Sequence, residues 1–252
     1  MKRPTVLIAI VLLAIAGSAT ASEWLRWTTA ALPEMPGFCC ATRQAGEMQS
    51  STCKLEGGNE IYGTVDGAPH SDTVQVYARY DAGVLAAVRV YDGACAVQAT
   101  SPVRELGALE AQASLSRLLG PISDSRRAMQ DRLVAVAQHP GEPALDWLKQ
   151  RSREGARDER RDAWFWLGQR LGTGVAPLVR EALPKADSDL REHLVFVLSQ
   201  MPAPAAVDAL IALVEDRRLD RDLRGRALFW LAQSEDARAF AYLDRRLDPA
   251  GS

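Results

Sequence analysis

The chain has 252 residues, of which 47% are hydrophobic and 25% are charged, with a formal net charge of −2 at pH 7. This length fits one large domain or, more usually, two domains, and this composition excludes wholesale disorder. A net charge so near zero argues against a general nucleic-acid binder.

Residues 1–21 have the features of a secretory signal peptide. The segment starts with two basic residues, continues as a short apolar run and ends in Ala19-Thr20-Ala21, which provides the small residues that a signal peptidase requires. The run is too short to span a bilayer, which takes about 20 apolar residues. We therefore expect cleavage after Ala21, an exported chain that is periplasmic or secreted, and no stable membrane anchor after cleavage.

Four cysteines lie in the region that follows, residues 22–103. They are Cys39, Cys40, Cys53 and Cys95. An even number of cysteines in an exported chain predicts two disulfides. A ring between adjacent Cys39 and Cys40 would be strained, so we expect each to bond separately, one to Cys53 and the other to Cys95. The alternative is a redox or metal site, but there is no C-x-x-C pair and no nearby histidine cluster. We expect no cofactor.

The same region carries strand patterns. Apolar and polar residues alternate over Thr73–Tyr80 and again over Val84–Tyr91, where Val84, Ala86, Val88 and Val90 would share a face, with a turn at Asp81-Ala82-Gly83 between the two runs. This pattern predicts a β-hairpin. Short strands are expected at Ile61–Val65 and Cys95–Ala99, and irregular structure over 22–52. The sequence therefore predicts a small, disulfide-bonded, β-rich N-terminal domain.

A connecting segment is expected over residues 104–125. Residues Glu105–Leu119 have a helical pattern that stops at Gly120-Pro121. No further strand is expected beyond Ser101-Pro102.

The C-terminal half repeats itself. Three six-residue segments superpose without gaps, at 164–169, 195–200 and 228–233, and a degenerate copy precedes them at 133–138. Their final glutamines are 31, 31 and 33 residues apart. A period in this range is typical of stacked supersecondary units, here helix, tight turn, helix.

The copies agree in further positions. An arginine stands nine residues before each of the last three glutamines, and an aspartate stands two residues before each arginine. We expect the aspartates to cap helix N-termini and the arginines to reach acids of an adjacent repeat or turn. These predicted capping and ladder residues are Asp158, Arg160, Asp189, Arg191, Asp222 and Arg224.

The six-residue segments themselves supply the predicted repeat core. Its members are Phe165, Leu167, Phe196, Leu198, Phe229 and Leu231. The alternative is that the aromatic residues form a ligand platform. The core is favoured because Trp166 and Trp230 share a column with the aliphatic Val197.

These units resemble HEAT repeats of the short bacterial kind, over about Arg126 to Leu247. The aromatic form of the segment, F-W-L-[GA]-Q, is similar to that of secreted bacterial HEAT-repeat proteins of uncharacterised function. The resemblance implies a right-handed α-solenoid whose concave face binds macromolecules, and it implies no catalytic residues. The expected fold class is multidomain α+β, with the β-rich domain followed by an all-α, HEAT-like solenoid of about four repeats over 126–252.

The motifs of common enzyme classes are missing from the sequence. It has no G-x-S-x-G, H-E-x-x-H, P-loop or G-x-G-x-x-G motif, and only three scattered histidines. We therefore expect no enzyme activity and no catalytic, cofactor-binding or metal-binding residues. The favoured function is a non-catalytic, exported scaffold for a protein partner. The alternatives are a cysteine-based redox or metal-binding protein, or a binder of an anionic cell-envelope polymer.

Overall fold

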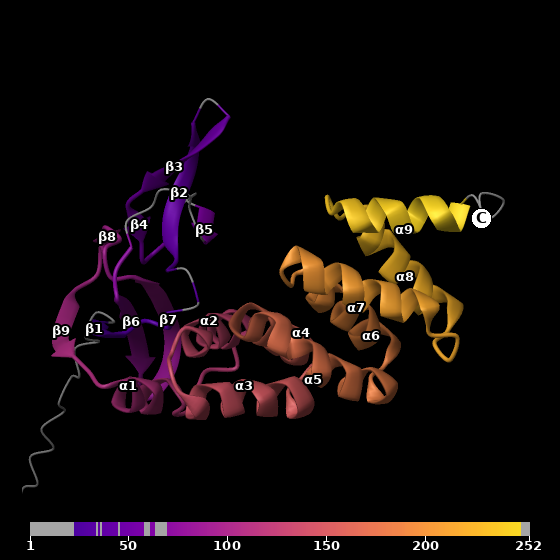
Figure 1. Cartoon of the computed structure of the whole chain (residues 1–252). Coiled ribbons are helices and arrows are strands. Elements are labelled where there is room, and N and C mark those ends of the chain that lie inside the picture. The colour runs from indigo at the N-terminus through magenta and orange to yellow at the C-terminus, as the bar shows by residue number, and fades with distance from the viewer. Residues whose placement is uncertain are drawn as a thin grey trace, which may run out of the picture.

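A computed structural model of the chain describes residues 23–33, 35, 37–44, 46–57, 61–63 and 70–247. The predicted signal peptide and its cleavage site lie outside these residues. Figure 1 shows β-sheets at the N-terminal side and a run of helices that leads away from them, with the last helix at the far end. None of the described helices combines the length and the apolar character needed to cross a bilayer.

The central sheet of the described residues has the strand order β7-β6-β1-β9. Its strands are β1 (Trp24–Ala30), β6 (Thr73–Asp81), β7 (Val84–Asp92) and β9 (Val103–Ala108). Strand β1 pairs antiparallel with β6 and parallel with β9. Smaller sheets are formed by β2 (Cys39–Gln44), β3 (Glu47–Ser51) and β5 (Ile61–Gly63), and by β4 (Cys53–Lys54) and β8 (Val97–Gln98).

The predicted hairpin is present as β6 and β7, but one detail of its register was wrong. The turn is the pair Ala82 and Gly83, both with positive φ, which is the conformation that two-residue hairpin turns require. A register shift next to Tyr80 inserts an extra residue into β7. As a result Leu85, rather than Val84 or Ala86, is fully buried on the core face with Val88. A β-bulge of this kind reverses the alternation on one side of it.

Two expectations for the flanking segments were wrong. Residues 24–30, 39–44 and 47–51 form strands β1, β2 and β3 instead of irregular structure, and residues 103–108 form strand β9 instead of the start of a helix. Helix α1 is confined to Ala111–Leu118. Strand β1 lacks simple alternation because Trp24 and Trp27 are buried in different hydrophobic clusters on the two sides of the sheet. Strand β9 covers what would otherwise be the open edge of β1.

Two disulfides are present, as predicted, and they pair Cys39 with Cys95 and Cys40 with Cys53. The four cysteines are buried and form a second hydrophobic cluster around Trp24, Tyr77 and Tyr91. Disulfides compensate for the small core of such a region. They also fit an oxidising or extracellular compartment.

The C-terminal region consists of helix pairs. Its helices are α2 (Arg126–Ala137), α3 (Glu142–Glu154), α4 (Arg157–Leu171), α5 (Val175–Ala182), α6 (Ser188–Ser199), α7 (Ala203–Glu215), α8 (Arg221–Ala232) and α9 (Ala237–Leu247), with a short 3-10 turn, η2 (Leu183–Lys185), after α5. Helices α2, α4, α6 and α8 each contact the next in that order. Each carries one copy of the repeated segment.

The sheet and the helices share one core. A continuous hydrophobic cluster runs from Trp27 on β1 through the helix pairs to Tyr242 on α9, and β7 packs on α2. Arg89 of β7 pairs with Asp131 of α2 across this junction. Beside it, the guanidinium of Arg132 donates to the carbonyl oxygens of Leu118 and Gly120 at the end of α1. The β-rich and helical regions are therefore joined by a packed, hydrogen-bonded interface.

A buried polar chain crosses the same junction. The indole nitrogen of Trp27 donates to the Ser114 hydroxyl at 2.6 Å, and that hydroxyl faces Nε2 of His139 at 2.6 Å. Nδ1 of His139 lies 2.6 Å from the carbonyl oxygen of Ala135. A carbonyl can only accept, so Nδ1 carries the proton and Nε2 accepts from Ser114. Burial lowers the pKa of His139 to about 4, which keeps the ring neutral at pH 7.

Candidate functional site

The helix N-termini are capped two residues earlier than predicted. The N-cap residues of α6 and α8 are Asp187 and Asp220, whose carboxylates accept from the amides of Leu190 and Leu223. The prediction of Asp158, Asp189 and Asp222 as caps was wrong, because these residues lie inside the first helical turns. The cap column is hidden in the sequence because α4 has alanine, Ala156, at that position.

The ladder arginines link consecutive helix pairs through the true caps. Arg160 lies 3.1 Å from Asp187, and Arg191 lies 3.5 Å from Asp220. Arg224 has no ion pair among the described residues, since no further helix pair follows α8 and α9 in them. Exposed ion pairs such as these are worth about 0–1 kcal/mol each, so they set register more than they supply stability.

A second rung connects the first turns of the helices. Arg126 pairs with Asp158 at 3.2 Å, and Arg157 pairs with Asp189. Asp222 lacks the equivalent partner because its column holds Ser188 in the preceding helix. The predicted aspartates therefore contribute charge to the surface of α4, α6 and α8 instead of capping these helices.

The predicted repeat core divides into two columns with opposite environments. Leu167, Leu198 and Leu231 are buried. Phe165 and Phe196 are only partly buried, and Phe229 is 49% exposed, so the phenylalanine half of the prediction was wrong. Successive helical residues are rotated by about 100°. Residues two apart therefore lie on nearly opposite sides of a helix. Where the leucine faces the core, the phenylalanine two residues before it faces away from the core.

The phenylalanines belong to a continuous row of rings, which we call the aromatic row. Its members are Phe38, Trp166, Phe165, Phe196, Trp230 and Phe229, in spatial order. The ring centroids of successive members are 5.7, 5.1, 6.3, 5.3 and 5.2 Å apart. These separations fall in the range of favourable aromatic pairs. The row starts next to β2 in the disulfide-bonded region and crosses α4, α6 and α8.

Phe38 is the member that sequence reasoning missed. It lies directly before Cys39, and its carbonyl oxygen accepts from the amide of Asp92 at 2.9 Å. The Cys39–Cys95 disulfide fixes the next residue, and the Phe38 ring then meets Trp166 of α4. No spacing in the sequence connects positions 38 and 166, because only the tertiary fold brings them together.

A groove of about 530 Å³ runs beside the aromatic row between α4, α6 and α8. Phe196 and Trp230 form its apolar part, and a second hollow, which shares Glu192 and Arg226 with it, continues to Phe229. The two hollows are lined by six arginines and three acids. The charged residues are Arg157, Arg161, Arg221, Arg224, Arg226, Arg246, Asp189, Glu192 and Asp222.

The histidine in this groove is not a free acid–base group. His193 packs on Phe196 with ring centroids 5.6 Å apart, and its Nε2 lies 2.7 Å from the carbonyl oxygen of Arg161. Burial lowers the pKa of His193, and the positive charge of Arg161 acts in the same direction. A neutral ring that donates to a backbone oxygen acts here as a link between α4 and α6.

The chemistry that this arrangement offers is recognition by stacking, cation–π contact and charge. Within the described residues, no group of three or more histidine, cysteine or acidic side chains is placed to hold a metal ion. A comparison with protein-family models finds none that matches the chain, and a comparison with curated proteins finds no similar sequence.

Proposed function

We propose that this chain is an exported, non-catalytic binding scaffold built as a HEAT-like solenoid, and that it holds a segment of a protein partner along the aromatic row. The observation that carries the proposal is a column of phenylalanines in register on successive helix pairs, of which Phe165 and Phe196 are partly exposed and Phe229 is 49% exposed. A contiguous apolar strip with a charged rim is typical of interaction sites.

The composition of this surface supports the proposal. Tryptophan and arginine are enriched among residues that dominate binding energy, and here both line one groove. The excess of arginines over acids in the two hollows favours a partner segment that carries acidic as well as apolar side chains. Stacked helix pairs offer extended surfaces of this kind.

The same arginines also favour a second candidate, a binder of an anionic envelope polymer. The affinity for a polymer bound through charge alone falls steeply as the salt concentration rises. Affinity that comes from buried aromatic rings depends less on salt. The cysteine-based alternative finds less support, because all four cysteines are buried in disulfides and a reactive cysteine is an accessible thiolate.

Two matched phenylalanines provide the test. Phe229 in the aromatic row and Phe240 on α9, outside the row, have nearly equal exposure, 49% and 51%. Affinity capture from envelope extract with the exported protein should yield a protein that is lost with Phe229→Ala and kept with Phe240→Ala. Equal loss of the captured protein with both variants would indicate nonspecific hydrophobic binding. If the capture instead recovers a polymer that stays bound at low salt and dissociates at moderate salt, the second candidate is favoured.

A further inference from the structure

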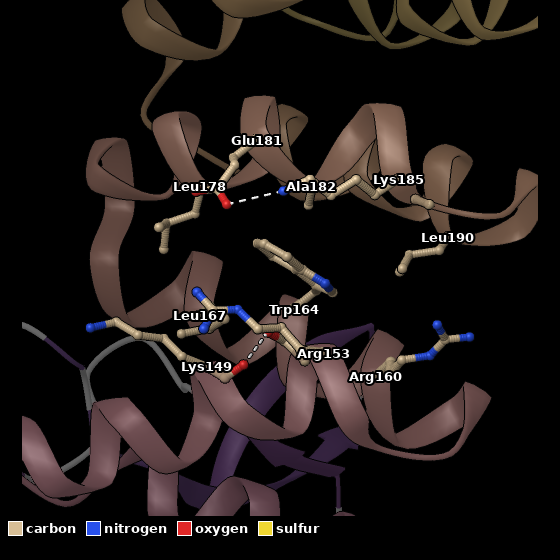
Figure 2. A pocket seen from close by; sticks show the side chains of 12 residues that line it. Lys149, Arg153, Arg160, Trp164, Leu167, Leu178, Glu181, Ala182, Lys185 and Leu190 are labelled. Carbon is tan, nitrogen blue, oxygen red and sulfur yellow. Dashed lines mark hydrogen bonds and ion pairs between the residues drawn. The ribbon is translucent and has the colours of Figure 1, made fainter.

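A separate cavity lies between the first and second helix pairs, at the start of the third. Its volume is about 270 Å³, and it is enclosed by α3, α4, α5, η2 and the start of α6. Trp164, Leu167, Leu178 and Leu190 form its apolar wall. Figure 2 shows the Trp164 indole lying across the middle of this space. Ligand pockets in proteins are typically about 300–1,000 Å³, mostly apolar, with a few convergent polar groups, so this cavity suits a small ligand.

Two hydrogen-bond donors at this cavity have no partner among the described residues. They are the indole Nε1 of Trp164 and Nε of Arg160, and both atoms are buried. Trp164 is 5% exposed. The two residues are four apart on α4 and therefore neighbours on one helix face. In Figure 2 the indole nitrogen is at the end of the ring that faces Arg160 and Leu190. Buried donors normally have partners, so this side of the cavity wall is short of hydrogen-bond acceptors.

The rim of the cavity is cationic. Besides Arg160, it carries Lys149, Arg153 and Lys185, and Glu181 is the one acid among the described residues that line it. Lys149 pairs with Asp146 at 3.2 Å, and Lys185 pairs with Glu181 at 3.3 Å. Arg153 is exposed and has no ion pair among the described residues. Its guanidinium is the charge at this rim that an incoming anion can use without breaking an existing pair.

We propose that this cavity binds a small apolar monocarboxylate, with the hydrocarbon body against Trp164 and the leucines and the carboxylate beside Arg153. An acceptor-only group with two oxygens matches a site whose unpaired polar atoms are all donors. The site is distinct from the aromatic row, and its occupancy does not depend on the protein partner proposed above.

Calorimetric titration of the exported protein with three probes of one chain length tests the charge requirement. Octanoate should bind, octanol should bind more weakly, and octylamine should not bind. Arg153→Gln should weaken octanoate binding roughly tenfold, the size of one charge-assisted hydrogen bond, and leave octanol unchanged. The matched control is Arg161→Gln, which removes another exposed arginine that has no ion pair among the described residues and lies outside this cavity. It should change the binding of neither octanoate nor octanol.

A cavity-filling variant tests the location. Ala182→Leu places a larger side chain in the cavity wall and should abolish binding of octanoate and octanol. If a thermal melt shows no folded Ala182→Leu protein, Ala186→Leu is used in its place. The proposal is overturned if octanoate does not bind, if octylamine binds as well as octanoate, if Arg153→Gln and Arg161→Gln have equal effects, or if a folded cavity-filling variant binds octanoate normally.

Discussion

Acid should destabilise this protein through His139. The imidazole is fully buried at the junction of the sheet and the helices, where Nε2 accepts from Ser114 and Nδ1 donates to Ala135. A second proton on the ring would remove the acceptor of the Ser114 hydroxyl and place a charge in the core. The network therefore holds only while the ring is neutral.

The magnitude follows from the two pKa values of the same ring. Burial lowers the pKa of His139 to about 4 in the folded protein, whereas an unfolded histidine titrates near 6.5. Above about pH 6.5 the ring is neutral in both the folded and the unfolded protein, and its full contribution to the free energy of unfolding is present. Between about pH 6.5 and 4 only the unfolded state takes up the proton, so the free energy of unfolding falls as the pH falls. At about 1.4 kcal/mol per pH unit, the loss is about 3 kcal/mol.

Urea melts at pH 7 and pH 4 on wild-type protein and His139→Gln measure this loss. The variant should be less stable at pH 7, because the Ser114 hydroxyl, which accepts from Trp27, loses the imidazole as its own acceptor. Its further loss on acidification should be about 3 kcal/mol smaller. Carboxylates titrate in both proteins and cancel in the comparison. Equal acid losses would refute the reasoning. So would a His139 resonance that titrates near pH 6.5 in the folded protein by NMR.

Two further predictions concern local features of the helix pairs, both measured by urea melts. Asp220→Ala removes an N-cap hydrogen bond and should cost about 1 kcal/mol, whereas Asp222→Ala, inside the same first turn, should cost less; the reverse order would return the cap to the predicted position. Gly168→Ala should destabilise, because the new Cβ would lie 2.8 Å from Val197 Cγ1 at the contact of α4 with α6 and overpacking costs about 1–3 kcal/mol. Gly225→Ala has nothing within 4 Å and should stabilise α8 by up to about 1 kcal/mol; destabilisation by both would mean that the difference in packing is not the cause.

Features encoded by local patterns were predictable from the sequence. The period-two alternation located the hairpin of β6 and β7, and the even cysteine count with two adjacent members gave separate disulfides. Strands β1 and β9 were not predictable in this way, because their pairing is tertiary. Strand β1 is buried on both sides and so loses its alternation, and β9 is ordered by the edge that it covers.

The candidate site shows the same division. Internal repetition aligned Phe165, Phe196 and Phe229 correctly, but a shared column does not say whether it faces the core or the surface. The spacing to the leucines two residues later carries that information, because both columns cannot point inward at 100° per residue. The contact of Phe38 with Trp166 had no signal at all, since it joins two regions through a disulfide-anchored segment.

The central claim is that the aromatic row holds a protein segment, and a photo-crosslinking scan of the full chain tests it most directly. A photoreactive phenylalanine analogue would replace Phe165, Phe196 or Phe229, or Phe240 as a control whose exposure matches that of Phe229. The account predicts the same protein crosslinked from all three row positions, with adjacent peptides of that protein captured from consecutive helices, and no such adduct from Phe240. Absence of crosslinks along the row, or the same yield from Phe240, would contradict it.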